Sequence, residues 1–418
     1  MAPTTAAMSA SNDKRVRRRH VLYLSGFDPQ GPGHYHALYA DQAALQSKVS
    51  GDRITVGPRQ RVGRNAAWDV RWQGADGGEA VDTRYEFLRW DDIVRQHWPR
   101  GQVRLLAVTI RTTARLLVNG SLWRILQTSW PAFLALSLPA SLIAGVVFAL
   151  LGLAGLAWSI GSHTTAWLGV AVVVGGIVPL RAWAKGAQAK VQMAWLMRSA
   201  SVVLQQSRGQ LPTLEERLDQ FAKRLCELVV APHVDEVLVV GHSSGAMLAV
   251  SVLARALGAD RQLLQRPASV SLLTLGECIP LLSYQPEAAK FRQELGTLRA
   301  AHDLNWIDVT APPDGCCFAL IDPTDVCEDG VPTEARASGG GPKRVSPRFV
   351  RCFPPERYQA IRRDRYRCHF QYLMAVEVPG TYDYFALTAG PRRLADNFAH
   401  QPAVTRFTDF QCFGGPRR

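Results

Sequence analysis

A long run without charged residues lies in the middle of the chain. No Asp, Glu, Lys or Arg occurs between Arg124 and Arg181. One membrane-spanning helix needs about 20 predominantly apolar residues, so this run has room for two spans and a tight turn. We expect the first span at residues 130–157, the turn at 161–165 and the second span at 166–184.

The residues around this run match a membrane hairpin. Aromatic side chains concentrate at membrane interfaces, and tryptophans lie near both ends of each expected span, at Trp130, Trp158, Trp167 and Trp183. Basic residues flank the run on both sides and are absent from the turn, so the positive-inside rule places both flanks in the cytoplasm. A buried hairpin in a soluble core is the competing interpretation, but the run offers no polar face to water.

The expected location follows from this hairpin. We expect an integral protein of a bacterial inner membrane, with the globular domain and both termini in the cytoplasm. Its partner is the lipid bilayer, through residues 129–185. Two spans without intramembrane charges argue against a transporter or channel.

Outside the run, short apolar segments alternate with helical ones. This alternation predicts an α/β fold with a mostly parallel sheet and helices on both faces, interrupted by the transmembrane hairpin. A capping-box pattern at residues 213–216 predicts a helix start there. The expected strands lie at 21–24, 53–56, 68–72, 85–90, 237–240, 270–275 and 306–309, and the main helices at 36–48, 187–206, 213–230 and 245–257.

We divide the chain into four segments. A disordered basic tail covers residues 1–19, where no apolar signal-peptide core follows the charges. The first part of the globular domain covers residues 20–128 and the transmembrane hairpin 129–185. The second part covers residues 186–418 and includes a Gly-containing loop insertion at 331–348.

Composition narrows the classes of partner. The net charge of +13 favours anionic partners such as nucleic acid or anionic lipid headgroups. The arginines cluster around the hairpin and in the C-terminal third without a recognisable nucleic-acid-binding motif, so we expect no nucleic acid partner. The 8 cysteines lack the paired Cys/His spacing of a zinc site, and we expect no metal and no cofactor.

The clearest chemical signal is Gly241-His-Ser-Ser-Gly245, which matches the G-x-S-x-G nucleophile elbow. In such an elbow the serine lies at a tight strand-to-helix turn, and the helix N-terminus faces the developing oxyanion. An apolar strand precedes this motif and a helical segment follows it, as the elbow requires. Ser243 is therefore the candidate nucleophile. We expect the His242 side chain to point away from the catalytic histidine.

With this elbow the chain resembles the α/β-hydrolase superfamily, in particular lipase- and esterase-like members with Gly-His-Ser-x-Gly motifs. The resemblance implies that a catalytic acid and then a histidine follow the serine along the chain. Asp314 lies in a Pro-Asp-Gly turn after an expected strand and is our choice for the acid. Asp322 and Asp325 remain alternatives.

The same resemblance implies the remaining site residues. His369 is our choice for the base, and His400 is the alternative because it also follows Asp314 in the chain. The oxyanion hole would combine the backbone amides of Ser244 and Phe27. Ser25 stands where the family often has histidine, at the end of the first expected strand.

These residues predict a reaction. Ser243 attacks a carboxylic ester or thioester, His369 takes the serine proton, and Asp314 orients the histidine. Anchorage beside a bilayer favours a lipid-like substrate. The alternative function is a catalytically inactive membrane scaffold or binding protein that keeps the hydrolase fold.

Overall fold

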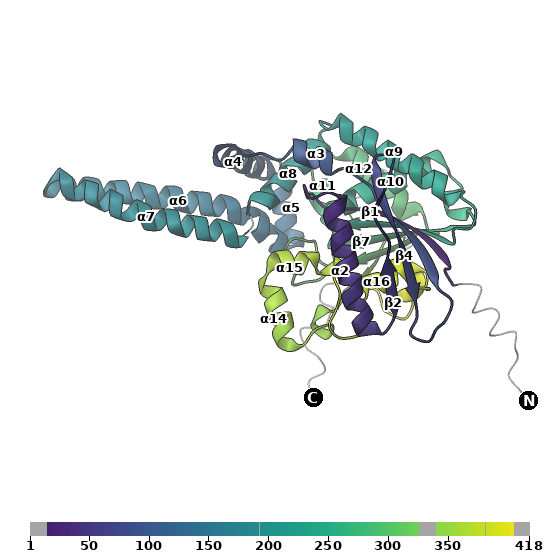
Figure 1. The fold of residues 1–418 in the computed structure, drawn as a ribbon. Coiled ribbons are helices and arrows are strands. Elements are labelled where there is room, and N and C mark those ends of the chain that lie inside the picture. Colours follow the sequence, from purple (N-terminus) through teal and green to yellow (C-terminus); the bar gives the residue numbers. More distant parts are fainter. Residues whose placement is uncertain (1–14, 192, 326–339, 381, 405–418) are drawn as a thin grey trace, which may run out of the picture. The chain divides into compact units, whose positions relative to one another are not determined.

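The computed structural model describes residues 15–191, 193–325, 340–380 and 382–404. They form two compact units (Figure 1). The larger unit comprises the described residues within Met1–His97 and Gln205–Arg418, and the smaller one comprises those within Trp98–Leu204. The smaller unit begins well before residue 129, so it contains two helices that the sequence analysis assigns to the globular domain. These helices are α4 (Gln102–Val118) and α5 (Ser121–Thr128).

A nine-stranded sheet forms the centre of the larger unit. Its strand order is β2-β4-β5-β1-β6-β7-β8-β9, with β3 paired to β4. Every strand that the apolar pattern predicts is present. The strands are β1 (Arg18–Leu24), β2 (Arg53–Val56), β3 (Gln60–Val62), β4 (Asn65–Gln73), β5 (Val81–Phe87), β6 (Glu236–His242), β7 (Ser269–Leu275), β8 (Asn305–Val309) and β9 (Lys343–Val345).

The sheet is mixed. Strands β5, β1, β6, β7, β8 and β9 pair in parallel, whereas β2, β3 and β5 pair with β4 in antiparallel orientation. Chain length explains the antiparallel part, because a parallel crossover needs a dozen or more residues. Only Gly63 and Arg64 separate β3 from β4, and Gly63 supplies the positive φ of 57° that this tight turn uses. The expected α/β class is confirmed, but the expected mostly parallel sheet is not, because the sheet is mixed.

Helices cover both faces of the sheet. Helices α2 and α16 join one core cluster with the side chains of Val21 and Tyr23 in β1. On the other face α10 packs against β6, and α9 and α12 pack against α10 (Figure 1). The helices are α2 (Pro32–Ser50), α3 (Asp91–Gln96), α9 (Pro212–Val229), α10 (Gly245–Ala259), α11 (Ile279–Ser283), α12 (Ala289–Ala300), α14 (Pro355–Arg363), α15 (Arg365–Phe370), α16 (Tyr384–Ala389) and α17 (Leu394–Asn397).

Two segment boundaries in the structure differ from the predicted ones. Strand β1 begins at Arg18, inside the predicted tail of residues 1–19, because the Arg19 guanidinium forms a fully buried ion pair of 2.8 Å with Glu236. Strand β9 lies within the predicted loop insertion at 331–348. Residues 1–14 of the tail and 326–339 around the insertion lie outside the described residues.

One predicted helix start is wrong. Helix α9 begins at Pro212 after Leu211, and no side-chain hydrogen bond caps it. Thr213 therefore does not serve as the cap that the capping-box pattern predicts. Proline at the first helical position needs no hydrogen bond to its nitrogen and has its φ already set for a helix, so the helix starts one residue earlier.

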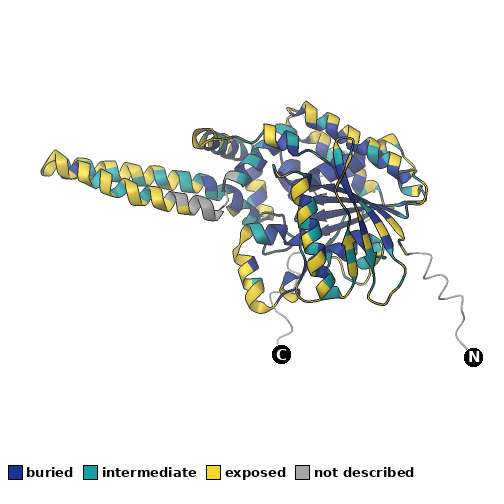
Figure 2. Ribbon diagram, viewed as in Figure 1, coloured by how far each residue is buried: buried dark blue, intermediate teal, exposed yellow. Residues whose placement is uncertain are grey.

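The smaller unit contains the two long apolar helices. They are α6 (Trp130–His163) and α7 (Ala166–Val191), followed by α8 (Met193–Ser207), whose last residues belong to the larger unit. Two stretches, Trp130–His163 and Ala166–Trp183, are long and apolar enough to cross a membrane. Helix α6 continues to His163, so the turn is shorter than predicted. Figure 2 shows exposed residues along both helices, as apolar surfaces that face lipid would be.

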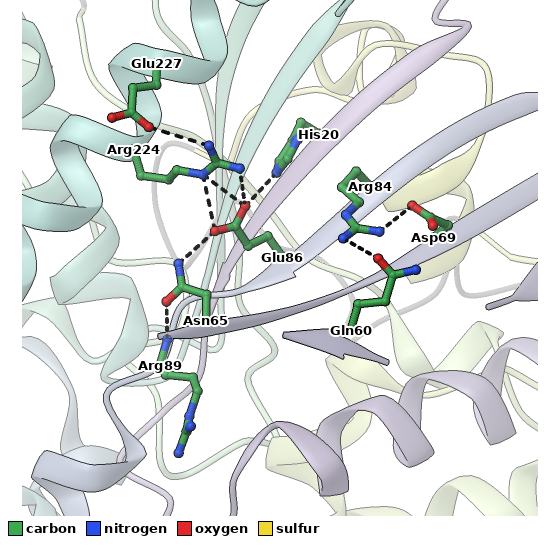
Figure 3. A network of polar contacts seen from close by, with 9 residues as sticks. All are labelled: His20, Gln60, Asn65, Asp69, Arg84, Glu86, Arg89, Arg224 and Glu227. Atoms are coloured by element: carbon green, nitrogen blue, oxygen red, sulfur yellow. Dashed lines mark hydrogen bonds and ion pairs between the residues drawn. The ribbon is translucent and has the colours of Figure 1, made fainter. Parts of the chain in front are cut away.

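A buried carboxylate ties the outer part of the sheet to α9 (Figure 3). Glu86 accepts hydrogen bonds from His20 Nε2 at 3.0 Å, Asn65 Nδ2 at 2.7 Å and the Arg224 guanidinium at 3.0 Å. Burial by itself would raise the pKa of Glu86, but hydrogen bonds from His20, Arg224 and Asn65 outweigh it and lower the pKa to about 2.

We expect Glu86→Gln to destabilise the protein at neutral pH. The pKa falls from 4.5 to about 2 on folding, which corresponds to about 3 kcal/mol of stability. A lowered pKa stabilises the folded state above pH 4.5, and this contribution disappears as the pH falls toward 2. Chemical denaturation should show the difference between wild type and variant shrinking over that range.

Asp69→Asn is the matched control for that prediction. Asp69 forms an ion pair of 2.8 Å with Arg84 in the same part of the sheet, but its side chain is 64% exposed (Figure 3). Exposed pairs contribute little, so this variant should stay within about 1 kcal/mol of wild type. Equal losses in both variants would contradict the role assigned to Glu86.

Candidate active site

Ser243 lies in the turn that joins β6 to α10. Its φ is 57°, in the left-handed region that residues other than glycine rarely adopt. The Ser243 amide donates to the carbonyl of Leu275 at 2.9 Å, and its carbonyl accepts from the Ala246 amide at 3.0 Å. These bonds hold the strained backbone between strand β7 and the first turn of the helix. Strain of this kind accumulates at functional sites.

The two glycines of the motif permit this close packing. A Cβ at Gly241 would lie 2.6 Å from Ala246 Cα, and one at Gly245 would collide with the carbonyl of Leu24 at the end of β1. Gly26, just after β1, lies against the Ser243 side chain, because its added Cβ would lie 3.0 Å from Ser243 Cβ. The motif therefore needs glycine on both sides of the serine for steric reasons.

Asp314 and His369 form a buried pair. His369 Nδ1 lies 2.8 Å from Asp314 Oδ2, and the two side chains are 1% and 0% exposed. Burial would raise the pKa of Asp314, but the charge and hydrogen bond of His369 lower it overall. The carboxylate is therefore ionised at neutral pH and accepts from Nδ1–H. A neutral imidazole with its proton on Nδ1 has a basic Nε2.

Backbone and side-chain donors support the carboxylate. Cys316 N donates to Asp314 Oδ1 at 3.0 Å, and the Tyr372 hydroxyl donates to Oδ2 at 3.2 Å. Tyr372 also accepts from the Ala311 amide at 2.9 Å, at the end of β8. These contacts fix the position of Asp314 in the turn after β8.

His242 lies beside His369, so the expectation that it points away is wrong. Its Nε2 donates to the carbonyl of His369 at 2.9 Å, and the two ring centroids are 4.9 Å apart. Burial and the neighbouring His369 lower the pKa of His242 to about 3, so its ring is neutral. His242 immediately precedes Ser243 in the chain. Its bond to His369 therefore ties the start of the Ser243 turn to α15, which carries His369. Side chains alternate between the two faces of a strand, which sets the face on which His242 lies. The sequence alone could not show that α15 packs against that face.

The two alternative acids have arginine partners, and the alternative base is exposed. Asp322 approaches Arg344 at 3.9 Å, and Asp325 approaches Arg299 at 3.8 Å. His400, the alternative base, is exposed. Of the three candidate acids, Asp314 is the one for which the structure gives a bond to His369.

One of the two expected oxyanion amides already has a hydrogen-bond partner. Phe27 N donates to the Ser244 hydroxyl oxygen at 2.7 Å, so an oxyanion could use this amide only after that bond opens. Ser244 is the N-cap of α10, directly after Ser243. Both residues are buried, as is Ser243, which is 5% exposed.

Cys278 is a neighbour of Ser243 that the motif could not reveal. Burial raises the pKa of its thiol well above the usual value, and the nearby Ser243 side chain offsets only part of that rise. Cys278 is therefore a neutral thiol. It follows β7 by a few residues and carries no spacing signal in the sequence, so only the fold brings it to the serine.

One group in the site has donor atoms suited to a metal ion. Asp314, Cys316 and His369 offer a carboxylate oxygen, a thiol sulfur and a ring nitrogen that lie within 4.8 Å of one another. The carboxylate and histidine are already bonded to each other, and burial together with Asp314 raises the pKa of the Cys316 thiol. A metal would have to remove the thiol proton before Cys316 could bind it.

The chain was compared with models of protein families, with curated proteins and with solved structures, and none of the three comparisons gave a significant match.

Proposed function

We propose that this protein is a membrane-anchored serine hydrolase that cleaves a carboxylic ester or thioester with an α/β-hydrolase-type site. The observation that carries the proposal is the Asp314–His369 pair. His242 binds the backbone carbonyl of His369, and the next residue is Ser243 with its left-handed backbone. A serine at a strand-to-helix elbow together with a buried acid–histidine pair is the arrangement that activates a nucleophile.

In the proposed reaction the Ser243 hydroxyl adds to the acyl carbonyl and passes its proton to His369 Nε2. The ionised Asp314 keeps the histidine proton on Nδ1 and stabilises the imidazolium that forms. His369 then protonates the leaving alkoxide or thiolate, and the acyl group remains on Ser243. Water, deprotonated by His369, releases the acid and restores the serine.

A lipid-like substrate is the preferred class. Helices α6 and α7 are long and apolar enough to anchor the chain in a bilayer, which would tether the site to a membrane that contains acyl lipids. This support comes from proximity and leaves the acyl chain and headgroup open, because a fold does not determine a substrate.

The alternative is an inactive membrane scaffold. Two observations favour it: Ser243 is 5% exposed, and the Phe27 amide is bonded to the Ser244 hydroxyl. An active hydrolase has to admit an acyl group to Ser243 and open that bond.

Labelling with a fluorophosphonate probe tests the proposal. We expect the detergent-solubilised wild type to be labelled, and Ser243→Ala and His369→Ala to lose the label. His400→Ala is the matched control, because His400 is exposed, and it should keep wild-type labelling. A folded wild type that stays unlabelled would leave the scaffold as the better interpretation.

A further inference from the structure

The smaller unit has an unusual charge pattern. No Asp or Glu occurs between Asp92 and Glu215, a range that contains the whole unit. All charged side chains of the unit are therefore basic. They are Arg100, Arg104, Arg111, Arg115, Arg124, Arg181, Lys185, Lys190 and Arg198. Such a purely basic segment is attracted to an anionic surface, and each Lys or Arg near an anionic leaflet strengthens that attraction.

Helix α4 has more apolar surface than its own unit covers. Leu105, Thr109, Thr112, Thr113 and Leu116 are buried, and α4 packs against α5 and α6. Next to this face runs a second apolar row, which is exposed. It consists of Val103 (82% exposed), Leu106 (44%), Ile110 (53%) and Leu117 (61%). These four residues follow the spacing i, i+3, i+7 and i+14, which places them on one side of a helix.

The arginines of α4 lie on its remaining face. Arg104 and Arg111 are seven residues apart and both are exposed. An apolar row with arginines on the polar side is the pattern of a helix that lies in the membrane interface, with its apolar side among the acyl chains. Long arginine side chains reach from that depth to the headgroups.

The chain connectivity sets the depth of this helix. Ser129 alone separates α5 from α6, and only Asn119 and Gly120 separate α4 from α5. If α6 enters the bilayer at Trp130, then α5 and the end of α4 are held at the level of the headgroups. Trp123 of α5 is 63% exposed, and tryptophan is enriched at this level.

We propose that α4 and α5 form an interfacial platform that lies on the bilayer beside the hairpin and prefers anionic phospholipid. The inference rests on the proposed insertion of α6 and α7 into the membrane. It is independent of ester hydrolysis. The platform extends the membrane contact beyond the two spans to helices outside the charge-free run.

Photo-crosslinking in vesicles tests the platform. The full chain carries a photoreactive benzoylphenylalanine in place of Ile110, and the lipid adducts are measured by mass spectrometry. Phe148 in α6, 73% exposed, reports on the insertion of the hairpin. Val230, an apolar residue of the larger unit that is 58% exposed, is the matched control. The vesicles contain phosphatidylcholine alone or mixed with phosphatidylglycerol.

We expect the Ile110 probe to form lipid adducts far above those of Val230, and more with phosphatidylglycerol than without. Each of Arg104→Gln and Arg111→Gln should weaken the preference for phosphatidylglycerol about fivefold. Adducts at Phe148 but not at Ile110, or an Ile110 adduct to a second copy of the chain, would overturn the platform alone. The absence of adducts at Phe148 and Ile110 would overturn membrane insertion as well.

Discussion

Replacing Ser243 by alanine is expected to lower the rate constant for ester hydrolysis by about a millionfold. His369→Ala should cost about as much, because the hydroxyl and the base act as one unit. The double variant should therefore lose no more than either single variant. A series of p-nitrophenyl esters of increasing acyl length provides the measurement and reveals the preferred chain at the same time.

The controls for this prediction come from the same site. His400→Ala should keep the wild-type rate, because an exposed histidine outside the Asp314 pair takes no part in the proposed proton transfer. If Ser243→Ala and His369→Ala instead had additive effects, the two groups would act independently. The proposed mechanism would then be wrong even if the protein hydrolysed esters.

The sequence predicts much of the larger unit because its strands carry strong local signals. The centre of β6 is an apolar run, Val237–Val240, and all seven residues of the strand are buried. Such a run indicates a strand covered on both faces, and the glycines after it indicate a sharp turn. Strand direction depends on loop length and on which strands become neighbours, so the antiparallel β2–β4 region was not predicted.

The site was predictable only in part. Asp314 and His369 are far apart in the chain, and their order relative to Ser243 came from the family resemblance. The structure supplies their bond of 2.8 Å. His242, Tyr372 and Cys278 contact the candidate residues through tertiary packing, which leaves no periodic or spacing signal in a single sequence.

The smaller unit shows a different limit. Its charge-free run was recognisable because a membrane imposes a length and a composition. Helix α4 contains arginines and threonines, so the same criterion assigned it to the globular domain. Its second apolar row becomes visible only when the structure shows which face of α4 is already covered. The division of an apolar surface between protein and lipid is a property of the folded chain.

Asp314→Asn is expected to lower kcat about ten-thousandfold while the fold is retained. The ionised carboxylate accepts from His369 Nδ1–H and so leaves Nε2 as the base. The amide of asparagine has a donor of its own, which favours the histidine tautomer with its proton on Nε2. That nitrogen could then no longer accept the proton of Ser243. Single-turnover kinetics on an activated ester should show the loss in the acylation step.

Three variants separate this tautomer effect from a general disturbance of the site. Tyr372→Phe removes one hydrogen bond to Asp314 but keeps its charge, so the loss should be about tenfold. Asp322→Asn and Asp325→Asn should leave kcat unchanged, since these carboxylates lie near Arg344 and Arg299. If one of these two variants lost most of its activity while Asp314→Asn stayed active, the carboxylate replaced in that variant would be the catalytic acid. The Asp314–His369 bond would then be structural, and another carboxylate would take part in activating Ser243.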